Sequence, residues 1–383
     1  MLRIVIIGGG ITGAAAAAEL ARKGHAVTLV EKHRIAAMAS GWTLGGVRQS
    51  GRDPAELPLA RAAVEIWGGL AETLGDVEYR RTGNLRLART PAEVDVIRAL
   101  VSAQQALGLE LHFLSDNAAV RTVAPEISRN VLAASYCPTD GHANPIKATQ
   151  AFARFAKEHG AIIREGVAAL AITTEGDRVT GVDTSDGLIP ADRLIVAAGV
   201  NTPSLLSPLG ADLPLSIRIT HVVQSEPLPS RLLPVFGVAN ADCAGRQEAD
   251  GRLRFSSGAG TWSGDPSEWT ERSLAPSASQ IRSIVDRVAQ VLPIAAEAPI
   301  ARSWGGLIDM TPDALPVIDS PEYLSGLVIA AGFSGHGFCL GPISGSLCAD
   351  LALGRVPRHD LSAFKLARFA GRVTTPSQLT LHG

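Results

Sequence analysis

The sequence lacks the cysteine spacings that mark metal and iron–sulfur sites. Its 383 residues include four cysteines, Cys137, Cys243, Cys339 and Cys348, and no two of them form a C-x-x-C pair. Four thiolates in this arrangement match no familiar cluster or metal site, so neither is expected. Reduced thiols in a cytoplasmic protein are the simplest interpretation.

The sequence also lacks an excess of either charge and any long apolar run. The 35 Lys and Arg residues face 37 Asp and Glu residues, which leaves a net charge of −2. This balance gives no reason to expect nucleic acid or an anionic membrane as a partner. No uncharged run of 18 apolar residues occurs, so no transmembrane segment is predicted. The N-terminus leads directly into an apolar run, without room for a signal peptide.

Enough apolar material is present for a large core. Hydrophobic residues make up 46% of the chain and charged residues 19%, a balance that does not indicate disorder. The length suggests two domains, or one large fold with an inserted second lobe.

The first 32 residues have the pattern of a dinucleotide-binding βαβ unit. The apolar run Leu2–Ile7 precedes Gly8, Gly10 and Gly13, which form G-x-G-x-x-G before a helix-forming stretch. Gly8 allows a tight turn, Gly10 lets the backbone approach a pyrophosphate, and Gly13 lets the helix lie close to the strand. A second strand ends at Glu31, whose carboxylate can accept hydrogen bonds from ribose hydroxyls. An ordinary packing turn would not need all these glycines, so the pattern predicts a dinucleotide of the FAD or NAD type.

The remaining pattern predicts an α/β fold with a Rossmann-type nucleotide-binding domain and an inserted antiparallel-sheet substrate domain. The first domain is assigned residues 1–82, 145–216 and 314–383, and the second residues 83–144 and 217–313. Helices are expected over residues 57–74, 92–107, 146–159, 281–292 and about 342–353. Strands are expected over residues 84–88, 109–114, 131–136 and 161–172, followed by a hairpin at Asp186–Gly187 and further β-like runs between residues 214 and 257.

Three apolar strands end in glycine, at Ile4–Gly10, Leu194–Gly199 and Leu327–Gly335. An NAD-dependent dehydrogenase needs only the first. GGGITG with Glu31, the LIVAAG strand and the later AAGFSGHGF motif together resemble the D-amino-acid oxidase and sarcosine oxidase (DAO) family of flavoproteins. The resemblance covers essentially the whole chain, and AAGFSGHGF is its most specific motif.

The resemblance implies non-covalent FAD as the cofactor. Gly332 to Gly337 would lie beside the isoalloxazine ring, where a helix starting near Pro342 would direct its positive end. Val167 would contact the adenine through its backbone. The residues implied to bind the cofactor are Gly8, Gly10, Ile11, Thr12, Gly13, Glu31, Lys32, Ser40, Gly45, Gly46, Val167, Ala198, Gly199, Gly332, Phe333, Ser334, Gly335, His336 and Gly337.

The resemblance also implies oxidation of a C–N bond by hydride transfer from the substrate to flavin N5. Arg48, in a position similar to a substrate-binding arginine of monomeric sarcosine oxidases, is the favoured carboxylate anchor because arginine offers two parallel donors. The alternative is that Arg48 is a solvated surface residue. Arg302 is a second candidate, with a domain-interface salt bridge as its alternative. His336 would face the flavin or the substrate, or would simply be a packed residue.

Three departures separate this chain from the simple oxidases. Cys339 stands where monomeric sarcosine oxidases have a lysine that helps to hold the carboxylate, so a second anchor must come from elsewhere. Gly306 stands where those enzymes attach flavin through a cysteine, which predicts no thioether. Ile308 stands where glycine oxidases have an arginine.

Residues 40–67 look closer to the β-type catalytic subunits of hetero-oligomeric opine (octopine or nopaline) and D-hydroxyproline dehydrogenases. That branch implies a secondary-amine amino acid as substrate. It also implies an α-type partner subunit for electron transfer, and it leaves open whether an iron–sulfur centre or subunit accompanies that partner. The alternatives are an oxygen-using sarcosine, glycine or D-amino-acid oxidase, and a non-catalytic FAD subunit that relays electrons.

Overall fold

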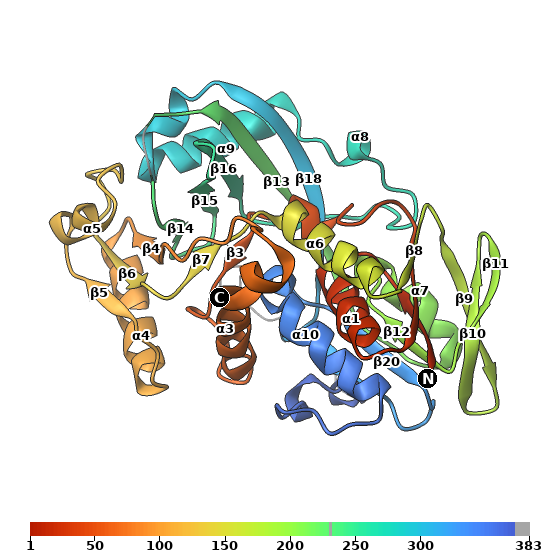
Figure 1. Cartoon of the computed structure of the whole chain (residues 1–383). Coiled ribbons are helices and arrows are strands. Elements are labelled where there is room, and N and C mark those ends of the chain that lie inside the picture. The colour runs from red at the N-terminus through yellow and green to blue at the C-terminus, as the bar shows by residue number, and fades with distance from the viewer. Residues whose placement is uncertain (230–231, 372–383) are drawn as a thin grey trace.

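The computed structural model describes residues 1–229 and 232–371. Two large sheets dominate it, one of six strands and one of nine (Figure 1). The arrangement is the predicted α/β class with a Rossmann-like nucleotide-binding sheet. Within the described part of the chain, no helix is long and apolar enough to cross a membrane.

The six-stranded sheet has the order β19-β20-β12-β1-β2-β8. Neighbouring strands are parallel except β19 with β20. Its central strand β1 is fully apolar after its first residue, as expected for a strand covered on both faces. The strands are β1 (Arg3–Ile7), β2 (Ala26–Glu31), β8 (Ile162–Glu165), β12 (Arg193–Val196), β19 (Val317–Asp319) and β20 (Leu327–Ala331).

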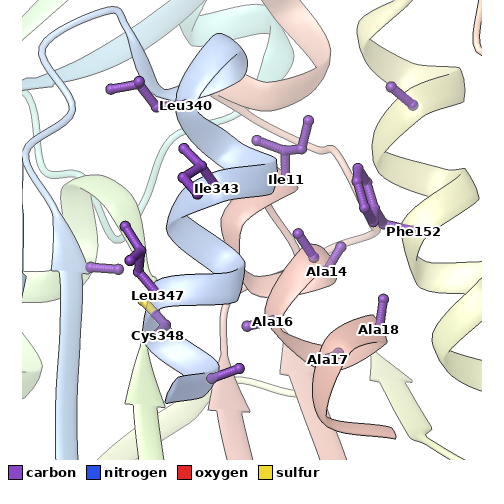
Figure 2. Close-up of a cluster of buried hydrophobic side chains, with 14 of the residues drawn as sticks. Ile11, Ala14, Ala16, Ala17, Ala18, Phe152, Leu340, Ile343, Leu347 and Cys348 are labelled. Atoms are coloured by element: carbon purple, nitrogen blue, oxygen red, sulfur yellow. The ribbon is translucent and has the colours of Figure 1, made fainter. Parts of the chain in front are cut away.

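Helices cover one face of this sheet, and a small sheet covers the other. Helix α1 (Ile11–Arg22) lies between α6 (Pro145–Glu158) and α10 (Gly337–Ala352), and small residues let them approach closely (Figure 2). A Cβ on Gly345 would lie 2.6 Å from the Cβ of Ala15, so a larger residue there would force α1 and α10 apart. The opposite face packs against the sheet formed by β9 (Ala169–Glu175), β10 (Arg178–Thr184) and β11 (Gly187–Pro190).

The nine-stranded sheet presents one face to a helix and the other to the nucleotide-binding half. Helix α9 (Ala278–Val291) packs Ile284 and Val288 against alternate strand residues such as Leu85 and Phe255. Its capping box, made by Ser277 and Gln280, fixes the start of the helix. The strands are β4 (Asn84–Ala88), β5 (His112–Leu114), β6 (Ala133–Cys137), β13 (Ser216–Pro227), β14 (Val235–Val238), β15 (Cys243–Gln247), β16 (Arg252–Ser257), β17 (Gly260–Thr261) and β18 (Ile300–Met310).

The remaining elements connect these layers. Helices α3 (Leu57–Leu74) and α4 (Pro91–Ala106) lie near their predicted positions, and β3 (Gly46–Val47) pairs with β7 (Gly141–His142). The short helices are α2 (Ala39–Trp42), α5 (Asn117–Val123), α7 (Thr202–Leu206) and α8 (Glu271–Leu274).

Three predictions from the pattern are corrected. Residues 161–172 form two strands in different sheets, because the chain turns at Gly166 with a φ of 75°. The substrate-side sheet is not purely antiparallel, since β14 pairs with β4 in parallel. Helix α10 begins at Gly337, five residues before Pro342, which therefore lies inside the helix. The assignment of residue ranges to two domains stays a prediction; the last twelve residues of the first, 372–383, lie outside the described part.

Candidate active site

A cavity of about 560 Å3 receives residues from both large sheets. It extends from the Glu31 end of β2, past the glycine turn after β1, to Arg48 and the nine-stranded sheet. Its volume is within the range of small-molecule and cofactor sites. Because the carboxyl ends of parallel strands commonly bind dinucleotides, its position matches the Rossmann sheet beside it.

Each of the three glycines of the first turn is needed for a different structural reason. Gly8 has a φ of 111°, and a Cβ there would lie 2.2 Å from the carbonyl oxygen of Ala197 at the end of β12. A Cβ on Gly13 would lie 2.1 Å from the carbonyl oxygen of Gly8, which confirms the need for close helix–strand contact. A Cβ on Gly10 would meet only the Ser40 hydroxyl, at 3.1 Å, on the border of the cavity. Gly10 therefore keeps open a space that the fold itself does not fill.

The start of α1 offers amide groups to this space. Its N-cap residue is Gly10, which has no side chain to accept a hydrogen bond from the N–H groups of the first turn. Ser40 instead accepts the Ile11 N–H through its hydroxyl at 2.9 Å. Helix N-termini carry unpaired N–H groups and a partial positive charge, so this end suits a pyrophosphate.

Glu31 is held at the opposite side of the same turn. Its carboxylate accepts the Gly9 N–H at 2.6 Å and the His33 N–H at 2.8 Å. Burial raises the pKa of Glu31, although both backbone hydrogen bonds oppose the rise. Because each carboxylate oxygen can accept a further bond, the position of Glu31 would suit the ribose hydroxyls of a dinucleotide.

Most residues implied to bind the cofactor line the cavity, and five do not. Val167 lines it, but its N–H donates to the Glu31 carbonyl at 2.9 Å and is not free for adenine. Lys32 lines it while donating to the Ser267 carbonyl. The residues in the lining are Gly8, Gly10, Ile11, Thr12, Glu31, Lys32, Ser40, Gly46, Val167, Ala198, Gly199, Phe333, Gly335 and Gly337. Those outside it are Gly13, Gly45, Gly332, Ser334 and His336.

The turn between β20 and α10 closes another side of the cavity. Asp309 on β18 lines the cavity and accepts the Gly332 N–H at 2.7 Å, while its carbonyl accepts the Ser334 N–H at 3.0 Å. Burial raises the pKa of Asp309 to about 6, against the opposing effect of the backbone hydrogen bonds. Since α10 begins at Gly337, its positive end lies at this turn rather than near Pro342.

Arg48 lies in the far end of the cavity and is half-buried, not an exposed surface residue. Its Nη1 donates to the Ser50 carbonyl at 3.0 Å. Burial, followed by the charges of Arg52 and Arg86, lowers the pKa of Arg48 well below its usual value. Both of these arginines also line the cavity. Cys339, which the sequence places where a lysine stands in monomeric sarcosine oxidases, is buried against the Arg48 carbonyl and does not line it.

The other two candidate catalytic residues lie outside the cavity lining. His336 is buried with Nδ1 3.1 Å from Oε1 of Glu56, so its side chain is engaged within the protein. Arg302 is exposed, donates to the Gln224 amide oxygen at 2.6 Å and lies over the Trp304 ring. It forms no domain-interface salt bridge within the described residues.

The sequence reasoning missed Arg52, Arg86, Glu56 and Asp309. A signal existed for each: Arg86 interrupts the apolar run of β4, Asp309 interrupts that of β18, and Arg52 and Glu56 are four residues apart before α3. An isolated charge in an apolar strand needs a partner or a ligand, since an unpaired buried charge is costly. Among the described residues, no group of three or more His, Cys, Asp or Glu could hold a metal ion.

The residues present fit FAD. The open cradle at Gly10, the start of α1 beside it and the carboxylate of Glu31 suit a pyrophosphate and a ribose. The turn at Gly335 and Gly337 brings backbone N–H groups and a helix N-terminus to the other end, and these would stabilise the negative charge that a flavin gains on reduction. None of the four cysteines lines the cavity.

Two known proteins are similar in sequence over nearly the whole of this chain. The 4-methylaminobutanoate oxidase (formaldehyde-forming) of Paenarthrobacter nicotinovorans is 30% identical over 97% of this chain, which spans only 46% of that relative's length. The sarcosine oxidase subunit beta of an Arthrobacter species is 28% identical over 96% of this chain and 90% of its own.

Two solved structures share the fold throughout. Glycine oxidase from Geobacillus kaustophilus superposes with a TM-score of 0.88 at 26% identity, covering 97% of this chain and all of the other. L-proline dehydrogenase from P. horikoshii gives 0.86 at 28% identity, covering 96% and 97%. The model of the FAD-dependent oxidoreductase (DAO) family matches residues 3–351. The chain therefore belongs to the DAO family of FAD-dependent oxidoreductases, and FAD is its cofactor.

Proposed function

We propose that this protein is an FAD-dependent dehydrogenase that oxidises the C–N bond of a secondary-amine amino acid, either an opine such as octopine or nopaline, or D-hydroxyproline. The observation that carries the proposal is that the half-buried Arg48 lines the same cavity as the glycine turn and Glu31. An arginine at the end of a cofactor cavity can fix a substrate carboxylate by two parallel hydrogen bonds.

The chain's own residues orient the substrate and exclude water. Arg48 binds the carboxylate, while apolar side chains such as Val222 and Leu307 keep the neighbouring space dry. Bound FAD supplies the hydride acceptor. The substrate amine must enter in its neutral form, because a protonated amine has no lone pair to assist the departure of the hydride. The resulting imine is hydrolysed or released.

Several relatives are named as enzymes that act on secondary amines, which supports a secondary amine over a primary amine as the substrate. These are 4-methylaminobutanoate oxidase, sarcosine oxidase and L-proline dehydrogenase. Ile308 lines the cavity where glycine oxidases have an arginine, which also separates this site from that of a glycine oxidase.

We propose further that the chain is the β-type catalytic subunit of a cytoplasmic hetero-oligomer, with an α-type partner that takes electrons from FAD. The likeness to a protein named sarcosine oxidase subunit beta supports this arrangement. FAD is held non-covalently, so denaturation should release all of it into the supernatant.

Substrate-dependent dye reduction tests the proposal. The purified holoenzyme, alone and with its co-expressed genomic neighbours, is offered octopine, nopaline, D-hydroxyproline, sarcosine and D-amino acids. The proposal expects dye reduction with a secondary amine and little peroxide. Rapid peroxide formation by the chain alone would instead indicate the oxygen-using oxidase that the glycine oxidase likeness allows. FAD that no substrate bleaches would indicate an electron-relay subunit.

Two arginine variants test the site itself. Arg48→Met should abolish substrate-driven bleaching of FAD, because it removes the carboxylate anchor. Arg302→Met is the matched control, since Arg302 is exposed and lies outside the cavity lining. Equal bleaching in both variants would show that Arg48 is not the anchor.

A further inference from the structure

The chain that leads from β17 into α8 is fixed at both ends to the nine-stranded sheet. At one end, the Trp262 N–H donates to the Ile217 carbonyl of β13 at 3.3 Å. At the other end Leu274 is buried, and its carbonyl oxygen lies so close to Gly305 of β18 that a Cβ there would be 2.0 Å away. Residues 263–273 between these two points are called the covering segment.

Three consecutive side chains after β2 each contact the covering segment. The contacts pair Lys32 with the Ser267 carbonyl, His33 with the Trp269 ring and Arg34 with the Glu271 carboxylate. The ring centroids of the second pair are 4.6 Å apart, and the ion pair of the third is 3.0 Å long. The covering segment belongs to one half of the molecule at its ends and therefore touches the other half directly beyond Glu31.

Side chains supply the contacts that join the covering segment to the nucleotide-binding half. Among the described residues, the backbone-to-backbone hydrogen bonds of the segment stay within the segment and α8. Examples are the Glu268 N–H to the Asp265 carbonyl, at 3.1 Å, and the Leu274 N–H to the Thr270 carbonyl, at 3.2 Å. A segment attached in this way opens at a lower free-energy cost than a strand within a sheet.

Trp269 places an aromatic ring in the wall of the cavity. It is half-buried, whereas its neighbours in the covering segment are exposed apart from Pro266, and it lines the cavity together with Ser267. Its ring meets that of Trp42 edge-on, with centroids 5.4 Å apart and an interplanar angle of 79°. Trp42 is itself buried and lines the cavity. Contacts with Trp42 and with His33 therefore hold the Trp269 ring at the border of the cavity.

The adenosine half of FAD would lie at this end of the cavity. The position of Glu31 suits the ribose hydroxyls, and the start of α1 suits the pyrophosphate. The adenine is attached to that ribose, and the cavity beside Glu31 is lined by Lys32, His33 and Trp269. An aromatic ring that stacks on a base typically raises affinity about fivefold to a hundredfold.

We propose that Trp269 is a cofactor-binding residue, and that the covering segment closes over the adenosine half of FAD and must open before FAD leaves. The nine-stranded sheet thereby supplies a contact to the part of the cofactor that the first glycine turn and Glu31 hold from the other half. This inference concerns the cofactor rather than the substrate, so it goes beyond the proposed function and does not depend on it.

The rate of FAD release measures the Trp269 contact without turnover. Holoenzyme is mixed with an excess of the apoprotein of another flavoprotein, which traps released FAD, and the change in flavin fluorescence is followed. Trp269→Ala should release FAD at least about fivefold faster than wild type, and Trp269→Phe should be intermediate. Trp262→Ala is the matched control, since Trp262 is half-buried on the same stretch but does not line the cavity, and it should release FAD as wild type does.

ADP and FMN separate the two halves of the cofactor. Calorimetric titration of apoprotein gives the dissociation constant of each ligand. Trp269→Ala should weaken ADP at least about fivefold and leave FMN unchanged, because only ADP carries the adenosine half. An equal loss for both ligands would indicate a general disturbance of the cavity and would overturn the assignment of Trp269 to the adenosine half.

The ion pair between Arg34 and Glu271 tests closure of the covering segment apart from the Trp269 ring. Arg34→Glu and Glu271→Arg each bring like charges together and should speed FAD release about twofold to fivefold. The double variant restores opposite charges and should return the release rate toward that of wild type. Both side chains are exposed, so neither substitution disturbs a core.

The outcomes decide the inference independently of the substrate. An unchanged release rate in Trp269→Ala, or the same change in Trp262→Ala, overturns the role of Trp269. Release from the double charge variant that is as fast as the two single effects combined overturns closure by the covering segment. If Trp269→Ala does not fold, Trp269→Phe and the charge variants decide the result. Release that depends on Trp269 in an enzyme whose FAD no amine bleaches would keep this inference and overturn the proposed function.

Discussion

The Nδ1 atom of His336 lies 3.1 Å from Oε1 of Glu56, and both side chains are buried. Glu56 is the N-cap residue of α3, and His336 is the N-cap residue of α10. Their contact therefore joins the starts of two helices directly behind the turn that faces the cavity. Burial, followed by the charge of Arg52, lowers the pKa of His336 to about 4. His336 is thus neutral at pH 7 and donates to the Glu56 carboxylate.

Acidification should destabilise the protein through His336. The unfolded chain takes up this proton near pH 6.5, whereas the folded chain does so only near pH 4. The contribution of neutral His336 to the free energy of unfolding is therefore fully present above pH 6.5. It is lost as the pH falls toward 4, and the loss amounts to up to about 3 kcal/mol. Urea unfolding at pH 7 and pH 4.5 should show a smaller loss for His336→Asn than for wild type. His112→Asn, at an exposed histidine, is the control, and an equal loss in all three proteins would contradict the account.

Glu31→Gln should weaken FAD binding about tenfold. The amide keeps the shape of the side chain but loses the charge and one acceptor oxygen, and hydrogen bonds to charged groups contribute about 1.5–3 kcal/mol. Titration of apoprotein with FAD, followed by flavin fluorescence, measures the change. Glu175→Gln, at an exposed glutamate at the end of β9, should bind FAD as wild type does. Unchanged affinity in Glu31→Gln would remove Glu31 from the ribose site.

Alanine at two glycines of the first turn should give different defects. Gly10→Ala should fold and lose FAD affinity, since its Cβ meets only Ser40 within the protein. Gly13→Ala should unfold at lower urea concentration even without FAD, because its Cβ would lie 2.1 Å from the Gly8 carbonyl oxygen. Gly68→Ala in α3, where a Cβ has open space, is the control and should stabilise the helix by up to about 1 kcal/mol. The same unfolding midpoint for Gly13→Ala and wild type would contradict this distinction.

Asp309→Asn should raise the midpoint potential of FAD at alkaline pH. With a pKa of about 6, Asp309 is ionised at pH 8 and mostly protonated at pH 5, and its negative charge opposes the gain of negative charge on reduction. Asparagine can still accept the Gly332 N–H through its amide oxygen. Anaerobic redox titration should show a variant potential higher by on the order of 30 mV at pH 8 and little changed at pH 5. A constant difference at both pH values would exclude titration of Asp309 as its cause.

Local patterns predicted the nucleotide-binding half of the fold well. The glycine turn, its helix and the strand ending at Glu31 depend on residues close in sequence, and α3 and β4 have clear apolar periodicity. The start of α10 was wrong because Pro342 favours a helix start, whereas packing of α10 against α1 extends the helix through the proline. Tertiary contact outweighed the local preference there.

The residues at the substrate end of the cavity could not be predicted as fully from the sequence. Arg48 follows from a resemblance, but Arg86 comes from a strand whose neighbour in the sheet, β14, lies about 150 residues later in the chain. No local pattern states that β14 will place a glycine beside it. A neutral cysteine at position 339 supplies no positive charge, and the fold places two further cations, Arg52 and Arg86, in the cavity lining.

Anaerobic single-turnover reduction tests the central claim most directly. Holoenzyme is mixed, without oxygen or dye, with an excess of a secondary-amine amino acid, and the flavin absorbance at about 450 nm is followed. We expect loss of this absorbance and one equivalent of imine hydrolysis product per FAD, and neither of these in Arg48→Met. Flavin that stays oxidised in wild type with every such amine would contradict the assignment as a C–N dehydrogenase.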